Sequence, residues 1–100
     1  MVLAMTPTLG PEAATLHRAV SEVLHYVWDP IGVAGTPEAR DEYEGYVDGV
    51  CGLLWHGADA NAVTAHLVAI ADDAMGVRGT QEQAARAAEI LLAWRDVVTR

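Results

Sequence analysis

The residues best suited to chemistry stand at the junction of two predicted helices. Trp28, Asp29 and Pro30 follow one another there, and they combine a large aromatic ring, a carboxylate and a residue whose φ is fixed. Because Asp29 follows a helix end, its carboxylate can accept backbone N–H groups and close an Asx-type turn. It could instead face solvent as a binding group. We favour the structural role for Asp29, and for Trp28 we favour a core anchor over a surface that stacks on a ligand.

A second group of candidate residues begins the next predicted helix. Helical spacing puts Tyr43 and Tyr46 on its apolar face, which predicts two core tyrosines with hydroxyl groups in water. The opposite half carries five carboxylates, namely Glu38, Asp41, Glu42, Glu44 and Asp48. This arrangement favours a solvated acidic face that recognises an Arg- or Lys-rich protein, because complementary charge speeds association. A small-molecule pocket, in which the tyrosines join Trp28 and Asp29, is the alternative.

Arg95 does not fit its surroundings in the sequence. Helical spacing places it on a broad apolar face made by Ala84, Ala88, Leu91 and Val98. A long basic side chain at a helix end can extend to water, whereas a buried guanidinium needs a hydrogen-bonded carboxylate. Our hypothesis is that Arg95 pairs with Asp29 or Asp41, which would bring it into the alternative pocket.

Motifs for catalysis or metal binding do not occur in the chain. The four histidines, at positions 17, 25, 56 and 66, have no metal-ligand spacing, and there is neither a nucleophile elbow nor a phosphate-binding glycine loop. Cys51 falls at the border of an apolar helix face, where an inert buried thiol is expected. We therefore predict no catalytic residue, no metal and no cofactor, and a binding protein rather than an enzyme.

The composition is that of one small, acidic, folded domain. The chain has 100 residues, 52% of them hydrophobic, and its fourteen Asp and Glu against six Arg give a formal net charge of −8. Such a charge disfavours nucleic acid and anionic membranes as partners, since both require basic residues. A single cysteine cannot form an intrachain disulfide, and the apolar start lacks the basic segment of a signal peptide. We expect a cytoplasmic protein with a protein partner, basic if it is a different chain.

Apolar residues recur at three- and four-residue spacing in four segments, which predicts an all-α domain. We expect an arm over residues 1–10 and one helical domain over 11–100. Its helices are expected at 11–28, with His25 on the outer side, at 37–56, at 60–75 after an Asp59 cap, and from a Thr80–Gln83 capping box to near the C-terminus. Short connections favour antiparallel neighbours. Three glycines at 45, 49 and 52 suggest either close approach by a neighbouring backbone or a soft helix.

The order of these features resembles a known family. Trp28-Asp29-Pro30-Ile31-Gly32 is followed by Asp41-Glu42-Tyr43 with Tyr46, and later by Met75-Gly76-Val77. Together they are similar to the YugE-like family of small bacterial helical proteins, whose function is unassigned, over about residues 16–94. The resemblance implies a compact helical domain and no catalytic residue. Small proteins of this general type include immunity proteins that accompany secreted toxins, which gives an analogy for function.

The predicted fourth helix carries a wider apolar face than a surface helix needs. Ile90, Trp94 and Val97 widen the stripe beyond the residues that face the other helices. Such a breadth indicates either a central helix or an oligomer interface. A homodimer through this face is therefore a further expectation.

Overall fold

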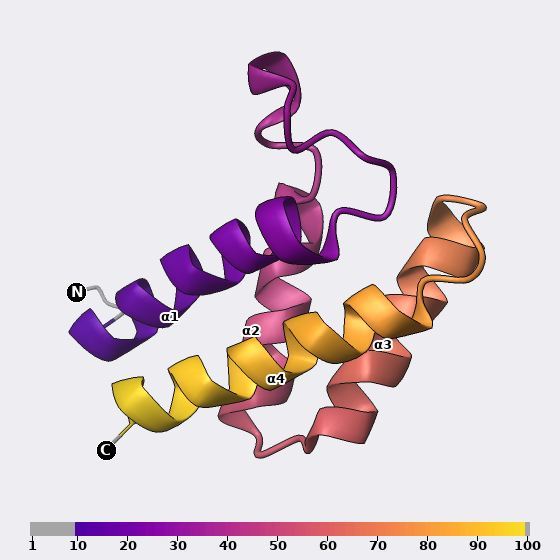
Figure 1. Ribbon diagram of the computed structural model, residues 1–100. Coiled ribbons are helices and arrows are strands. Elements are labelled where there is room, and N and C mark those ends of the chain that lie inside the picture. Colours follow the sequence, from indigo (N-terminus) through magenta and orange to yellow (C-terminus); the bar gives the residue numbers. More distant parts are fainter. Residues whose placement is uncertain (1–9, 100) are drawn as a thin grey trace.

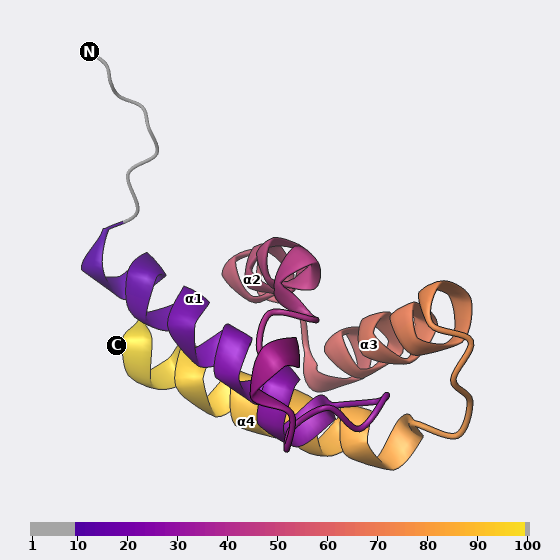
Figure 2. The same ribbon diagram turned by 90° about the horizontal axis from the view of Figure 1, so that it is seen from above.

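The computed structural model describes residues 10–99 and folds them into four α-helices (Figure 1). Their bounds are α1 Pro11–Val23, α2 Val47–Trp55, α3 Ala60–Ala74 and α4 Gln81–Val98. Helices α1 and α4 lie side by side and antiparallel, and α2 and α3 pack over one face of that pair (Figure 2). The predicted all-α, four-helix architecture is confirmed. Of the predicted arm over residues 1–10, all but Gly10 lies outside the described residues.

The first helix changes its winding before it ends. Pro11 occupies its first turn, and Leu16, Val20 and Val23 face the core. The last turn is a π-helix, η2 Leu24–Trp28, in which the Asp29 N–H reaches back to the Leu24 carbonyl at 3.0 Å. Asp29 then takes a left-handed backbone with φ 33°. The helix therefore stops at Trp28, as Pro30 predicts, because a residue before proline is disfavoured in the α region.

His25 lies in the interior, contrary to the outer position that helical spacing predicts. The side chain is only 2% exposed. Its ring is covered by Tyr26, at 4.5 Å between centroids, and by Tyr43, at 6.5 Å. The prediction is wrong because the chain after Asp29 folds back over the end of this helix, which a helical repeat cannot show.

The second predicted helix is real only in its second half. Residues 37–46 form two short 3₁₀ helices, η3 Pro37–Ala39 and η4 Glu44–Tyr46, joined by turns with the same i→i+3 hydrogen bonds. One continuous helix over 37–56 is thus a wrong prediction, and Thr36 makes no side-chain cap. A 3₁₀ turn repeats every three residues, so the spacing of Tyr43 and Tyr46 fits either kind of helix.

Three of the predicted helix ends have the expected geometry. Gly57, with φ 84°, closes α2 in a Schellman motif, since the Ala58 N–H donates to the Leu53 carbonyl at 3.0 Å. Asp59 caps α3 by accepting the Ala62 N–H at 2.8 Å. Gly76, with φ 68°, ends α3 as predicted.

The start of α4 differs from the predicted capping box. Thr80 makes no side-chain cap hydrogen bond. The Gln83 amide instead donates to the Trp28 carbonyl at 3.0 Å. A carbonyl at the end of a helix has no partner within that helix, so Gln83 satisfies a distant helix end rather than its own.

The three glycines at 45, 49 and 52, of which the last two lie in α2 and the first in η4, do not mark a close helix contact. A Cβ added at Gly45 or Gly52 would meet no atom within 4 Å, and at Gly49 the nearest is His66 Nε2 at 3.7 Å, an ordinary contact. Of the two explanations offered by the sequence, close backbone approach is therefore wrong.

Among residues 10–99, no helix combines the length and apolarity needed to cross a bilayer.

Candidate functional site

Asp29 holds the loop that follows the first helix. Its carboxylate accepts the Val33 N–H at 2.7 Å through Oδ1 and the Ala34 N–H at 3.1 Å through Oδ2. The Tyr43 hydroxyl donates to the same Oδ1 at 2.7 Å and accepts the Ile31 N–H at 3.2 Å. The structural role predicted for Asp29 is confirmed, and these contacts tie residues 29–34 to residue 43.

The ionisation of this pair follows from its surroundings. Burial acts to raise the pKa of the Asp29 carboxyl, but the Tyr43 hydroxyl and the two backbone N–H groups outweigh it, so the pKa lies below its ordinary value. Burial, and then the hydrogen bond to Asp29, raise the pKa of the Tyr43 phenol well above its ordinary value. The pair therefore consists of a carboxylate and a neutral phenol. The Tyr43 hydroxyl is not in water, which corrects that prediction.

Trp28 anchors the loop, as predicted, and is fully buried. Its ring lies 5.2 Å from the Tyr43 ring and 6.4 Å from the Tyr46 ring between centroids. Tyr43 is the only buried residue between Asp29 and Tyr46. The whole segment is thus attached to the core through one tyrosine and the tryptophan beneath it.

Four of the five candidate carboxylates lie on the surface of this segment, and the fifth, Asp48, lies just after it in the first turn of α2. Glu38, Asp41, Glu42, Glu44 and Asp48 are each exposed. The one basic residue among them, Arg40, lies over the Tyr26 ring at 5.6 Å and reaches the Ser21 hydroxyl at 3.5 Å. We name these five residues the acidic surface.

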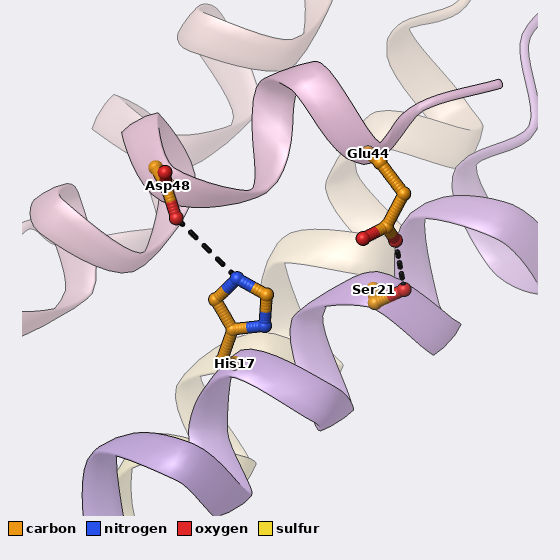
Figure 3. Close-up of polar contacts among 4 residues, drawn as sticks. All are labelled: His17, Ser21, Glu44 and Asp48. Atoms are coloured by element: carbon orange, nitrogen blue, oxygen red, sulfur yellow. Dashed lines mark hydrogen bonds and ion pairs between the residues drawn. The ribbon is translucent and has the colours of Figure 1, made fainter. Parts of the chain in front are cut away.

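Two members of the acidic surface touch α1 (Figure 3). The Ser21 hydroxyl donates to Glu44 Oε1, and His17 Nε2 lies 3.3 Å from Asp48 Oδ1, an ion pair only when the imidazole is protonated. Because Ser21 donates to a carboxylate and not to His17, the group lacks the serine–histidine hydrogen bond that activates a nucleophile. Exposed contacts of this kind add little stability, so we assign them a positioning role.

Sequence reasoning missed His17 and Ser21. They stand four residues apart on α1 and therefore on one side of that helix. Nothing in the sequence shows which segment lies opposite them. The two contacts depend on the packing of Glu44 and Asp48 against α1, which only the structure shows.

Arg95 lies away from the Trp28–Asp29 loop, so its predicted pairing with Asp29 or Asp41 is wrong. Its guanidinium donates to the carbonyls of Leu54, at 3.3 Å, and Ala58, at 2.8 Å. These carbonyls belong to the end of α2, where helical partners run out. A half-buried guanidinium did need acceptors, but backbone oxygens supply them.

The main surface depressions of residues 10–99 lie elsewhere than the alternative pocket. One is lined by Asn61, Thr64, Asp72, Asp73 and Gln81, between α3 and the start of α4. Three others meet at Trp94. None of these is lined by Trp28, Asp29, Tyr43, Tyr46 or Arg95.

Ligands for a metal do not gather within the described part of the chain, where no three His, Cys, Asp or Glu side chains could hold one ion. Cys51 is buried, as predicted, and burial followed by the nearby Asp48 carboxylate raises the pKa of its thiol to about 11. It is therefore protonated near neutral pH and a poor nucleophile.

Comparison of the chain with models of known protein families, with curated proteins and with solved structures found no match.

Proposed function

We propose that the protein is a non-catalytic interaction domain of the cytoplasm, and that its acidic surface binds a basic protein. The partner would present Arg and Lys side chains. By the analogy drawn from the sequence, the protein would act as an immunity-type or regulatory protein toward it. Nucleic acid and anionic membranes would be repelled by the same charges. Complementary charge would chiefly raise the rate of association and fix the orientation of the complex.

The observation that carries this proposal is the exposure of five carboxylates on this segment and the adjoining first turn of α2, which are held at a defined place. Asp29, Tyr43 and Trp28 fix the segment to the bundle. Glu44 accepts from the neutral Ser21 hydroxyl, to which Arg40 also donates. The contact of Asp48 with His17 offsets its charge only when the imidazole is protonated. Asp41 and Glu42 have no side-chain contact with residues 10–99 in the hydrogen-bond or ion-pair range and are free for a partner.

The test begins with a pull-down from native lysate at low and at high salt, followed by binding measurements with the purified partner. We expect the Asp41→Asn/Glu42→Gln variant to bind about tenfold more weakly, and wild-type affinity to fall with salt because exposed charges are screened. The matched control is Asp72→Asn/Asp73→Asn, which removes two carboxylates from α3. Equal losses in both variants, or salt-independent binding, would contradict the assignment of the acidic surface.

The alternative function, a small-molecule-binding protein or a minor enzyme with a site at the Trp28–Asp29 loop, has less support. Four of its residues contact one another, but the Asp29 carboxylate already accepts two loop N–H groups and the Tyr43 hydroxyl. The fifth, Arg95, lies at the end of α2 instead. Membership of the YugE-like family is likewise a proposal, which rests on the Trp-Asp-Pro and Met-Gly-Val motifs and adds no activity.

We also propose that the protein forms a homodimer through the outer side of α4. Trp94 and Val97 are 40% and 55% exposed there, a large apolar exposure for a surface helix.

A further inference from the structure

Of the five large apolar side chains that are exposed among residues 10–99, three gather on one face. Tyr26, at 58%, comes from the end of the first helix, and Trp94 and Val97 come from α4. Three surface depressions join them: Trp94 borders all three, Tyr26 one and Val97 two. We call the surface that α1 and α4 share around Trp94 the Trp94 face. It adjoins the acidic surface on residues 38–48 at Tyr26, over whose ring Arg40 lies.

Charges of both signs surround the Trp94 face, unlike the acidic surface. Glu12 and Glu22 border its depressions, and Arg18 is exposed on the same helix. Arg86 is exposed on α4, in line with Ile90, Ala93 and Val97 at helical spacing. In a chain of net charge −8, this surface offers a second copy charges of both signs, so that some of its contacts can be attractive.

Arg18 and Glu22 also suit a two-fold axis. They stand one turn apart on α1, on either side of Val20. The depressions of the Trp94 face border the first helix from Pro11 to Val27, so the middle of the face falls near Ala19, about one residue from Val20 and thus at nearly the same level of the helix. A two-fold axis that passes through that point at right angles to α1 sets the two α1 helices antiparallel. It places Arg18 of each copy opposite Glu22 of the other.

We propose that two copies of the chain pack through the Trp94 face about this axis. The two Arg18–Glu22 pairs lie at its edge, and Tyr26 of each copy covers the end formed by Thr15 and Val97 of the other. Trp94 supplies the central aromatic anchor, the kind of residue that dominates interface energetics. This arrangement specifies the proposed homodimer, on which it rests, and is independent of any basic partner.

The test is sedimentation of the full-length protein over a range of concentrations at low salt. The wild type is expected to dimerise, and Trp94→Glu to weaken dimerisation by about thirtyfold or more, as for the loss of a central aromatic anchor. Ile31→Glu is the matched control, because Ile31 is 40% exposed, like Trp94, but lies in the loop after the first helix. Circular dichroism establishes that each variant is folded.

A charge exchange tests the axis itself. Arg18→Glu alone and Glu22→Arg alone each place like charges opposite one another, so each variant should dimerise more weakly than the wild type. An equimolar mixture of the two should recover a dimer, since every cross-pair is then of opposite sign. A monomeric wild type would overturn both the homodimer and its geometry. A wild-type dimer whose two single variants show no recovery on mixing would overturn the geometry alone.

Discussion

At the scale of single residues, the loop after the first helix depends on an aspartate whose backbone conformation is uncommon. Asp29 has a positive φ, which costs free energy for any residue other than glycine. Three hydrogen bonds to its carboxylate, from Val33, Ala34 and Tyr43, offset that cost. The phenol of Tyr43 is the only one of these donors that comes from outside the loop.

Tyr43→Phe should therefore lower the free energy of unfolding by about 1–3 kcal/mol, because a hydrogen bond to a charged group is lost and the Ile31 N–H loses its acceptor. Urea denaturation measures the change. Tyr46→Phe is the matched control, since Tyr46 also packs against Trp28 but its hydroxyl makes no hydrogen bond within residues 10–99. Equal effects in the two variants would mean that ring packing, and not the Asp29–Tyr43 bond, carries the loop.

The low pKa of Asp29 also makes a prediction about pH. The folded carboxyl binds a proton less readily than the unfolded one, whose ordinary pKa is 3.8. Its contribution to stability is thus complete above that value and is lost as the pH falls below it through the folded-state pKa. Wild type should exceed Asp29→Asn in stability at about pH 7, and the difference should shrink toward about pH 3. A difference that is constant with pH would argue against an ionised, hydrogen-bonded Asp29.

Individual contacts were predictable from the sequence only where both partners are local. The Asp29 turn and the Asp59 cap each join residues a few positions apart, so residue type and spacing could predict them, although the equally local caps at Thr36 and Thr80 do not form. Gln83 and Arg95 instead serve helix ends 55 and 37 residues away. The sequence shows that these side chains need hydrogen-bond acceptors, but which acceptors they reach depends on how the helices pack.

At the scale of elements, α4 supplies hydrogen-bond donors to the ends of two other helices. The Gln83 amide donates to the last carbonyl of the π turn that ends the first helix, and the Arg95 guanidinium donates to two carbonyls at the end of α2. The apolar period predicted α1, α3 and α4 because each buries one regular stripe. It failed for residues 37–46, where i→i+3 turns give the same spacing as one face of an α-helix.

Arg95→Met tests the closure of α2. Methionine keeps an apolar stem but cannot donate to the Leu54 and Ala58 carbonyls, so we expect a loss of about 1–2 kcal/mol in the free energy of unfolding. Thermal or urea denaturation measures it, with Arg78→Met as control because Arg78 is exposed in the α3–α4 connection. A loss of equal size in the control would assign the effect to net charge rather than to the helix end.

At the scale of the whole molecule, the two proposed surfaces use different parts of the bundle. The acidic surface follows residues 38–48, and the Trp94 face spans α1 and α4. Arg40 and Tyr26 lie where they meet. A dimer would therefore present two acidic surfaces at once, so that a partner with two basic sites would be held more tightly by effective concentration without any new contact.

The segment that carries the acidic surface has one buried residue, Tyr43, between Asp29 and Tyr46. A stretch with so little apolar burial forms the kind of unit that opens locally while the rest of a protein stays folded. The four helices keep their own core during such an opening, because that core consists mainly of residues from α1 to α4. Four of the five carboxylates thus stand on a part of the chain that can be released and reordered, and a partner that needs them in their folded positions also selects the closed state of that segment.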